Sequence, residues 1–218
     1  MIVDESVSSG RVTDPAARRA VVKVLRATYH REKQWVSDPA SQFPPADLAR
    51  DDISWFVAKV DGKPVGVMRV LYDPPLLEYA KYGFTLLASA PKIEDFVKTN
   101  RVAEIGRFAV LPEYRGKFMI AAELMRAATE ETVARNYTHF VTDVFEDDPH
   151  SPLGFHTRVM GFLPVATHDV GELESGSRRI TMVLDLKACY RRLSVRRSWF
   201  FRYMTGQWAE ALHQRLAA

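Results

Sequence analysis

Residues 104–117 read EIGRFAVLPEYRGK, and this stretch decides how the rest of the chain is interpreted. It begins as an apolar strand, which Pro112 ends. A basic turn with Gly116 follows, and a helical pattern begins at Lys117. The first N–H groups of a helix have no partner within it, so together with Arg115 and Lys117 they favour a bound phosphate. An ordinary strand-to-helix connection with solvated charges would have the same residues.

A mixed pattern of helices and strands continues on both sides. Upstream, Asp14-Pro15 predicts the start of an amphipathic helix that ends near His30. Strands over 53–60 and 65–71 flank Asp61-Gly62, which predicts an antiparallel hairpin. The other predicted elements are a short helix at 46–50, a mixed helical insertion over 76–98, strands at 102–111, 140–145, 162–167 and 179–186, and helices at 117–135, 152–160 and 198–216. Because a helix joins the strands at 102–111 and 140–145, we expect these two strands to be parallel.

The composition is that of one globular domain with an appendage. The chain has 218 residues, 26% of them charged, and a net charge of +3. Its single cysteine, Cys189, excludes an internal disulfide, and the six histidines show no metal-ligand spacing, so no metal site is expected. The N-terminus does not resemble a signal peptide, and no stretch approaches about 18 apolar residues. We therefore expect a cytoplasmic protein.

The basic residues gather at the C-terminus. From Leu186 onward, seven basic residues oppose one acidic residue. This shift in charge predicts a main domain over 1–186 and a helical C-terminal extension over 187–218. Apolar residues recur every four positions between Phe200 and Leu216, and this stripe could pack on the domain, contact a membrane surface or meet a partner. The arginines between 191 and 202 would suit an acidic partner protein.

Two motifs resemble one family of enzymes. Residues 110–117 (VLPEYRGK), followed by residues 155–162 (FHTRVMGF), resemble the acyl-CoA-binding motif and the next helix and strand of the GNAT acyltransferases. The resemblance implies an α/β (α+β) fold with a mixed, mostly antiparallel sheet, whose central parallel strands splay to admit the pantetheine arm of the donor. It also implies the donor-binding residues, which are Ala109, Val110, Leu111, Arg115, Gly116, Lys117 and Phe118.

One departure from the family pattern concerns the donor. Phe118 and Ile120 stand where relatives that use small acyl groups have glycines, which let the backbone approach a pyrophosphate. This favours a donor with a single phosphate, the phosphopantetheine of acyl carrier protein, over coenzyme A. No tightly bound cofactor is expected in either case.

A second resemblance concerns the acceptor. Glu104-x-x-Arg107-Phe108, with Arg69 and with Arg26 and Trp35 upstream, resembles the acyl-homoserine-lactone synthases and the long-chain N-acyl amino acid synthases. It implies acceptor-binding roles for Arg26, Trp35, Arg69 and Arg107. The acidic cluster of the lactone synthases is only loosely reproduced, which favours the amino acid synthases.

Each candidate catalytic residue has a structural alternative. Glu104 would take the proton of an ammonium acceptor, or would form an ion pair with Arg107. Both side chains could face one cleft only if a bulge lies between them, and Gly106 is where we expect it. His156 would protonate the leaving thiolate, or would pack in the core. The apolar insertion would line an acyl tunnel, or would be ordinary core.

These expectations define a function and its rivals. The favoured function is an N-acyltransferase that moves a medium or long acyl group from acyl carrier protein or acyl-CoA to the amine of an amino acid or a similar small molecule. The alternatives are an acetyl-CoA-dependent acetyltransferase and an autoinducer synthase of the lactone type. A further alternative is a non-catalytic module that binds a membrane surface through its basic tail. Nucleic acid is not an expected partner, because the tail interleaves its arginines with apolar residues.

Overall fold

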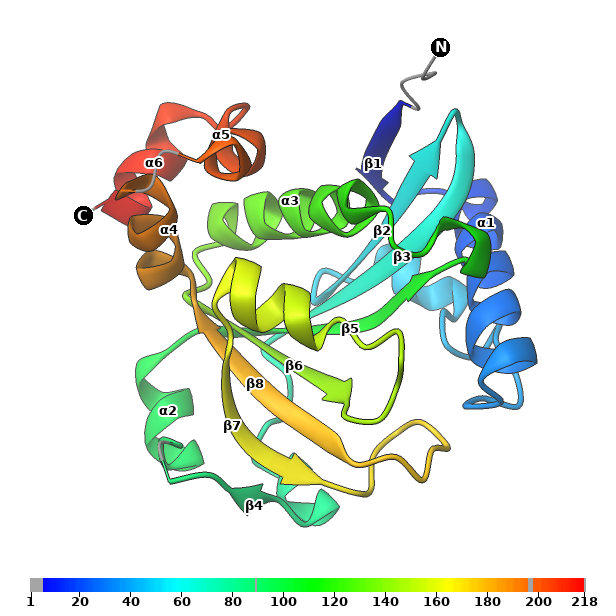
Figure 1. The fold of residues 1–218 in the computed structure, drawn as a ribbon, viewed down its shortest axis with the longest axis horizontal. Coiled ribbons are helices and arrows are strands. Elements are labelled where there is room, and N and C mark those ends of the chain that lie inside the picture. The colour runs from blue at the N-terminus through cyan, green and yellow to red at the C-terminus, as the bar shows by residue number, and fades with distance from the viewer. Residues whose placement is uncertain (1–5, 89, 196–197, 218) are drawn as a thin grey trace. The chain divides into compact units, whose positions relative to one another are not determined.

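The computed structural model describes residues 6–88, 90–195 and 198–217 (Figure 1). The chain forms two compact units, each built from two segments. The first unit comprises Met1–Leu71 and Gly106–Thr129, and the second comprises Tyr72–Ile105 and Glu130–Ala218. The extension predicted at 187–218 is part of the second unit, and a domain boundary at residue 186 stays a prediction.

One mixed sheet has eight strands in the order β1-β2-β3-β5-β6-β8-β7-β4. Most neighbours are antiparallel, whereas Val102–Ile105 of β5 pair in parallel with His139–Thr142 of β6, as the intervening helix predicted. The rest of β5 belongs to the first unit. The strands are β1 Val7–Arg11, β2 Ile53–Val60, β3 Lys63–Tyr72, β4 Thr85–Leu86, β5 Val102–Val110, β6 His139–Phe145, β7 Leu163–His168 and β8 Arg179–Asp185.

Helices account for most of the remaining elements. Two of them, η1 and η5, are π-helical, and three are short 3-10 turns. The helices are α1 Pro15–Leu25, η1 Arg26–Glu32, η2 Pro45–Ala49, η3 Glu78–Tyr82, α2 Ile93–Thr99, η4 Pro112–Tyr114, α3 Phe118–Ala134, η5 Phe155–Met160, α4 Leu186–Val195, α5 Trp199–Thr205 and α6 Glu210–Ala217.

The first unit begins as its sequence predicts. The Asp14 carboxylate accepts hydrogen bonds from the backbone N–H groups of Ala16 and Ala17 at 2.8 and 2.9 Å, which caps α1, and Pro15 occupies the first turn. The helix then continues as η1. Farther on, Asp61 and Gly62 both have positive φ, as a tight hairpin between β2 and β3 requires.

The core of the first unit forms where α3 meets β3. A Cβ atom on Gly66 would lie 3.0 Å from Ile120 and 3.4 Å from Leu124, both fully buried. Gly66 therefore lets α3 approach the strand closely. This contact places the N-terminal end of α3 directly after the turn that follows β5.

The insertion between β3 and β5 lies in the second unit and is less helical than predicted. It contains η3, the short strand β4 and α2, and β4 pairs with β7 through Thr85 and Leu86. Leu76 is buried with Val102 and Val141, and Tyr79 and Phe96 pack against them. Two paired residues are too short a strand to leave a period-2 pattern in the sequence.

The prediction of one terminal helix over 198–216 is wrong. The chain forms α5 and α6 there, after a further helix, α4, that the sequence analysis missed. Helix α5 ends at Thr205, and Gly206 is its C-cap, where a Cβ atom would lie 2.5 Å from the carbonyl oxygen of Arg202. The predicted apolar stripe is largely buried, at Phe200, Met204, Trp208 and Leu216, which favours packing over contact with a membrane. Among the described residues, no helix has the length and apolar character to span a bilayer.

Candidate active site

Strand β5 is distorted at Arg107, in the first unit. The backbone of this residue is left-handed, with φ at 51°, which is rare for a residue with a side chain. The distortion thus lies one residue after Gly106, where the bulge was expected. The Arg107 Nε donates a hydrogen bond to Gln42 Oε1 at 2.8 Å. This contact orients the guanidinium that was predicted to bind the acceptor.

The backbone of β5 after this distortion is held by side chains of the same unit. The hydroxyl of Tyr29, in η1, donates to the carbonyl oxygen of Phe108 at 3.2 Å. The Nε of Arg115 donates to the carbonyl oxygen of Val110 at 3.2 Å, and the N–H of Leu111 donates to Val65 at 2.9 Å. Val110 and Leu111, two of the predicted donor-binding residues, therefore already use a backbone group within the protein.

Arg115 differs most from its predicted role. Its two terminal nitrogens form a bidentate ion pair with the Glu32 carboxylate, with N–O distances of 2.6 and 2.5 Å, and its side chain is mostly buried. Such a fork-to-carboxylate pair is strong and directional. A phosphate at this guanidinium would have to displace Glu32, so the contacts favour a structural role that joins η1 to the turn after β5.

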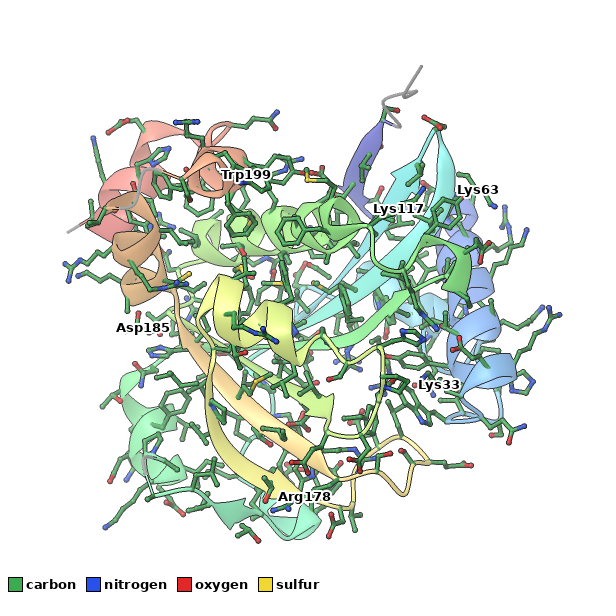
Figure 2. The ribbon with its side chains drawn as sticks, in the orientation of Figure 1. Lys33, Lys63, Lys117, Arg178, Asp185 and Trp199 are labelled. Carbon is green, nitrogen blue, oxygen red and sulfur yellow. The ribbon has the colours of Figure 1, made fainter. Side chains whose placement is uncertain are left out.

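The turn itself keeps cationic groups at the start of α3. Gly116 has φ of 79°, a conformation that glycine adopts without strain, and a Cβ atom there would meet open space. The ammonium groups of Lys63 and Lys117 lie 5.1 and 5.0 Å from the centre of the Tyr114 ring (Figure 2). Phe118 begins α3 and is 37% exposed. Of the groups predicted to bind a phosphate, Lys117 and the first N–H groups of α3 therefore fit that role better than Arg115 does.

The other predicted acceptor residues are spread over the first unit. Trp35 packs edge-on against Tyr29, with ring centres 5.2 Å apart. Arg69 is half-buried on β3 and lies opposite Trp55 in the β2–β3 register. Arg26 is exposed at the start of η1. Trp35 is linked to the β5 backbone through Tyr29.

In the second unit, Glu104 is half-buried on β5 and has a close partner. The hydroxyl of Tyr79, in η3, donates a hydrogen bond to Glu104 Oε2 at 2.5 Å. A hydrogen bond to a carboxylate stabilises its charged form and fixes its orientation. Strand β5 is also held at the next residue, Ile105, whose carbonyl oxygen accepts a hydrogen bond from Thr142 Oγ1 at 3.0 Å. Glu104 is therefore a carboxylate whose orientation is fixed by Tyr79.

A second acid–base pair lies near this tyrosine in the second unit. The Nε2 of His168 is 3.1 Å from Asp143 Oδ2, and its Nδ1 is 2.6 Å from the carbonyl oxygen of Val170. Burial lowers the pKa of His168, but the hydrogen bond and charge of Asp143 outweigh burial and raise it overall. The ring of Tyr82 stacks on His168 and also contacts Tyr79. The sequence analysis missed this pair, because residues 143 and 168 show no motif.

His156 is placed as a core residue. It is 1% exposed on η5, between the rings of Phe155 and Phe162. Burial lowers its pKa to about 4, so the imidazole is neutral at physiological pH. These features favour the packing role over the proton-donor role.

Four contributors were missed because their role depends on distant partners. Tyr29, Glu32 and Gln42 hold the β5 end of the first unit, and Tyr79 holds Glu104 in the second. In the sequence, Tyr29 lies within the predicted first helix, and Tyr79 lies within the apolar insertion predicted over 76–98. A polar tip on an aromatic residue within an apolar segment is the one signal that could have identified both tyrosines.

A family model identifies the family of the chain, and solved structures show a similar fold. The model of the acetyltransferase (GNAT) family matches residues 19–162. The structure of FeeM, an N-acyl amino acid synthase from uncultured soil microbes, is similar with a TM-score of 0.67 at 14% identity, over 89% of this chain and 99% of that one. The aminoglycoside acetyltransferase AAC(6')-Ib in complex with coenzyme A has a TM-score of 0.56 at 17% identity, over 87% and 99% of the two chains. An N-acetyltransferase from Staphylococcus aureus Mu50 has a TM-score of 0.55 at 8% identity, over 83% and 98%. The sequence search found no match among curated proteins.

Proposed function

Because the chain belongs to the acetyltransferase (GNAT) family, we propose that it is an N-acyltransferase that moves a medium or long acyl group to the amine of an amino acid or a similar small molecule. The donor is a thioester of acyl carrier protein or of coenzyme A. The observation that carries this proposal is the Glu104 carboxylate, which is held by the Tyr79 hydroxyl at 2.5 Å. An acceptor ammonium must lose a proton before it can attack, and an oriented carboxylate can take that proton.

The proposed reaction is a direct attack. Glu104 takes a proton from the acceptor ammonium, directly or through one water molecule. The amine nitrogen then forms a bond to the thioester carbon, the C–S bond breaks, and the leaving thiolate takes up the second proton, which the nitrogen loses as it becomes an amide. Backbone N–H groups of Ala109 and Val110 polarise the thioester carbonyl. Arg69 and Arg107 bind the carboxylate of the acceptor by charge-assisted hydrogen bonds. The overall similarity to FeeM supports this choice of acceptor.

The insertion of the second unit supports a long acyl group. Leu77, Leu86 and Leu87 are 54%, 59% and 38% exposed. Apolar side chains that the core does not use are available to an apolar ligand, and each buried methylene of such a ligand contributes about 0.8 kcal/mol. An acetyl group would leave these leucines unused. The test of this point is turnover with acetyl-, octanoyl- and hexadecanoyl-CoA, where we expect the longer donors to be used better.

The test of the base is Glu104→Gln. We expect turnover to fall about 100-fold or more, while donor affinity stays nearly unchanged, because the amide cannot accept the proton but keeps the shape. Tyr79→Phe should cost about tenfold, the value of one hydrogen bond to a charged group of about 1.4 kcal/mol. The readout is thiol release with amino acid acceptors, alongside donor binding.

The matched control for Glu104→Gln is Glu94→Gln, which changes an exposed glutamate on α2 of the same unit. It should retain full turnover. Full activity of the Glu104→Gln variant would remove the assignment of the base. A preference for acetyl-CoA over both longer donors would favour the acetyltransferase alternative.

A further inference from the structure

The first helix of the first unit has a basic groove of about 450 Å³ on its surface. All the residues that line it come from α1 and η1, which follow one another without a break (Figure 1). Residues 15–31 contain five basic residues and no acidic residue. The groove is lined by Arg18, Arg19, Val22, Lys23, Arg26, Ala27 and Arg31.

One of these cations is used by the fold. Arg18 donates through Nε to the carbonyl oxygen of Phe43 at 2.7 Å, and its guanidinium lies 5.6 Å from the centre of that ring. The other four, Arg19, Lys23, Arg26 and Arg31, are exposed. Within the described part of the chain, no side-chain hydrogen bond or ion pair joins these four to another residue. Their charge is therefore available to a partner.

Lys23 and Arg31 lie in the last turns of α1 and η1, where the helix dipole favours a cation, but the spacing of the row as a whole opposes helix stability. Arg19 and Lys23 are four residues apart, and Lys23 and Arg26 are three apart, so they are neighbours on one helix face. Like charges at these spacings destabilise a helix by about the amount that opposite charges stabilise it. A row of cations that opposes helix stability points to a role in binding.

We propose that this groove docks a carboxylate-rich helix of the protein that carries the acyl thioester. The assignment rests on the proposed function, which needs a thioester donor. Arg19 and Arg31 are 12 residues apart, so the basic row is about 18 Å long, which matches about three turns of a partner helix laid alongside. Opposite charges along that length would steer the encounter and set its register.

Two features of the groove favour a helix of a protein over other anions. The lining comes from a single helical segment, so the groove is open along its length and would not enclose a small anion. The exposed large apolar side chains of the described residues lie outside α1 and η1, so the groove offers no side chain for insertion into a lipid surface. Membrane and nucleic acid are therefore outcomes that the experiment must separate from a carrier protein.

The experiment uses fluorescently labelled holo acyl carrier protein and measures its binding by anisotropy. The test variant is Arg19→Glu/Lys23→Glu/Arg31→Glu, which spares Arg26 because that residue was also predicted to bind the acceptor. We expect the Kd to rise at least tenfold, and the affinity of the parent protein to fall as salt is raised. The matched control, Lys59→Glu/Lys92→Glu/Lys98→Glu, changes three exposed lysines by the same total charge and should keep the parent Kd.

Measurements of turnover with the two donors distinguish a loss of docking from a loss of catalysis. The test variant should keep parental turnover with acyl-CoA and lose kcat/KM with acyl carrier protein as the donor, through KM. If no donor is turned over, the proposed function fails, while anisotropy still decides the docking. If the test variant fails to fold, the Arg19→Gln/Lys23→Gln/Arg31→Gln variant replaces it.

Three results would overturn the proposal. One is an unchanged Kd for carrier protein in the test variant. Another is an equal loss of affinity in the control variant, which would show only an effect of net charge. The third is binding of duplex DNA, or of vesicles that contain an anionic phospholipid, more tightly than carrier protein and with dependence on the same three residues.

Discussion

The chain has two basic regions, the first helix with η1 and the C-terminal tail, and their cations do different things. In the tail, Arg192 donates to the carbonyl oxygens of Val159 and Met160 at 2.9 and 2.6 Å. In α1 and η1, four cations have no described side-chain partner. The charge count pointed to the tail as the docking surface for an acidic partner, whereas the contacts favour the first helix. Arg196 and Arg197, which belonged to that predicted patch, lie outside the described residues.

The tail uses its arginines at the ends of helices. Arg192 contacts the last turn of η5, and Arg215 donates to the carbonyl oxygens of Val133 and Ala134 at the end of α3. The last carbonyl groups of a helix have no partner within it and carry the negative end of the helix dipole. A guanidinium donates hydrogen bonds to these carbonyl groups, and its positive charge interacts favourably with the helix dipole. A basic segment is therefore free to bind a partner only if its charged groups form no contacts within the fold.

The largest expected effect concerns His156, which lies on η5, the helix whose last carbonyl groups Arg192 contacts. Its imidazole should make the free energy of unfolding depend on pH. Its pKa is about 4 in the folded chain and about 6.5 when unfolded, so the unfolded state binds more protons between these values. The free energy of unfolding should therefore fall as pH drops from about 6.5 to 4, by about 3 kcal/mol. Replacing His156 with Phe should remove this part of the pH dependence, as measured by urea unfolding at pH 7 and pH 4.5.

The matched control is His150→Gln, which changes an exposed histidine of the same unit and should leave the pH dependence as it is. Other groups titrate equally in both proteins and cancel in the difference. A His156→Phe variant that loses as much stability at low pH as the parent would contradict the assignment of a buried, neutral imidazole.

Arg192→Ala should have the next largest effect on stability. It leaves the carbonyl oxygen of Val159 without this donor and that of Met160 with only the Cys189 thiol at 3.1 Å, and opens space beside Gly161, where a Cβ atom would lie 2.7 Å from the Arg192 guanidinium. An unsatisfied, partly buried group costs about 2 kcal/mol, which lowers the melting temperature of a chain of this size by about 4 to 8 °C. Thermal unfolding measures it. A melting temperature equal to that of the parent would remove the distinction between the two basic regions.

Arg215→Ala should cost less, about 1 kcal/mol, because its side chain is exposed and a water molecule can replace part of the contact. Arg19→Ala, on the groove side of the comparison, should change the free energy of unfolding by no more than about 0.5 kcal/mol. Urea unfolding of the two variants checks the order. Equal losses would mean that Arg19 serves the fold as the tail arginines do.

Much of the fold was predictable because its signals are local. Asp14-Pro15, the alternating hydrophobic runs around Asp61-Gly62 and the strand ended by Pro112 each specify a structure within a few residues. The parallel pairing of β5 with β6 followed from the helix between them. The edge strands β1 and β4 were missed, because the first is exposed and polar and the second has two residues.

The sequence allowed a prediction of which residues form the candidate site, but not of the contacts that these residues make. Glu104, Lys117 and Gly116 lie where the motif implied, on a strand and at the start of α3. Arg115 was expected to meet a phosphate, but Glu32 lies 83 positions earlier in the chain and binds it in the folded structure. Tyr79 reaches Glu104 across 25 positions. No pattern in one sequence reports such pairs, since each depends on how separate elements pack.

The sequence by itself determined most of the elements between α1 and β8, the family and the stretch that carries the proposed chemistry, because turn residues, hydrophobic period and motif spacing act between near neighbours. Only the tertiary structure decided which charged side chains form contacts within the protein. A guanidinium that caps a helix and one that faces solvent are identical in the sequence, and only the position of a carbonyl or carboxylate from elsewhere in the chain makes them different.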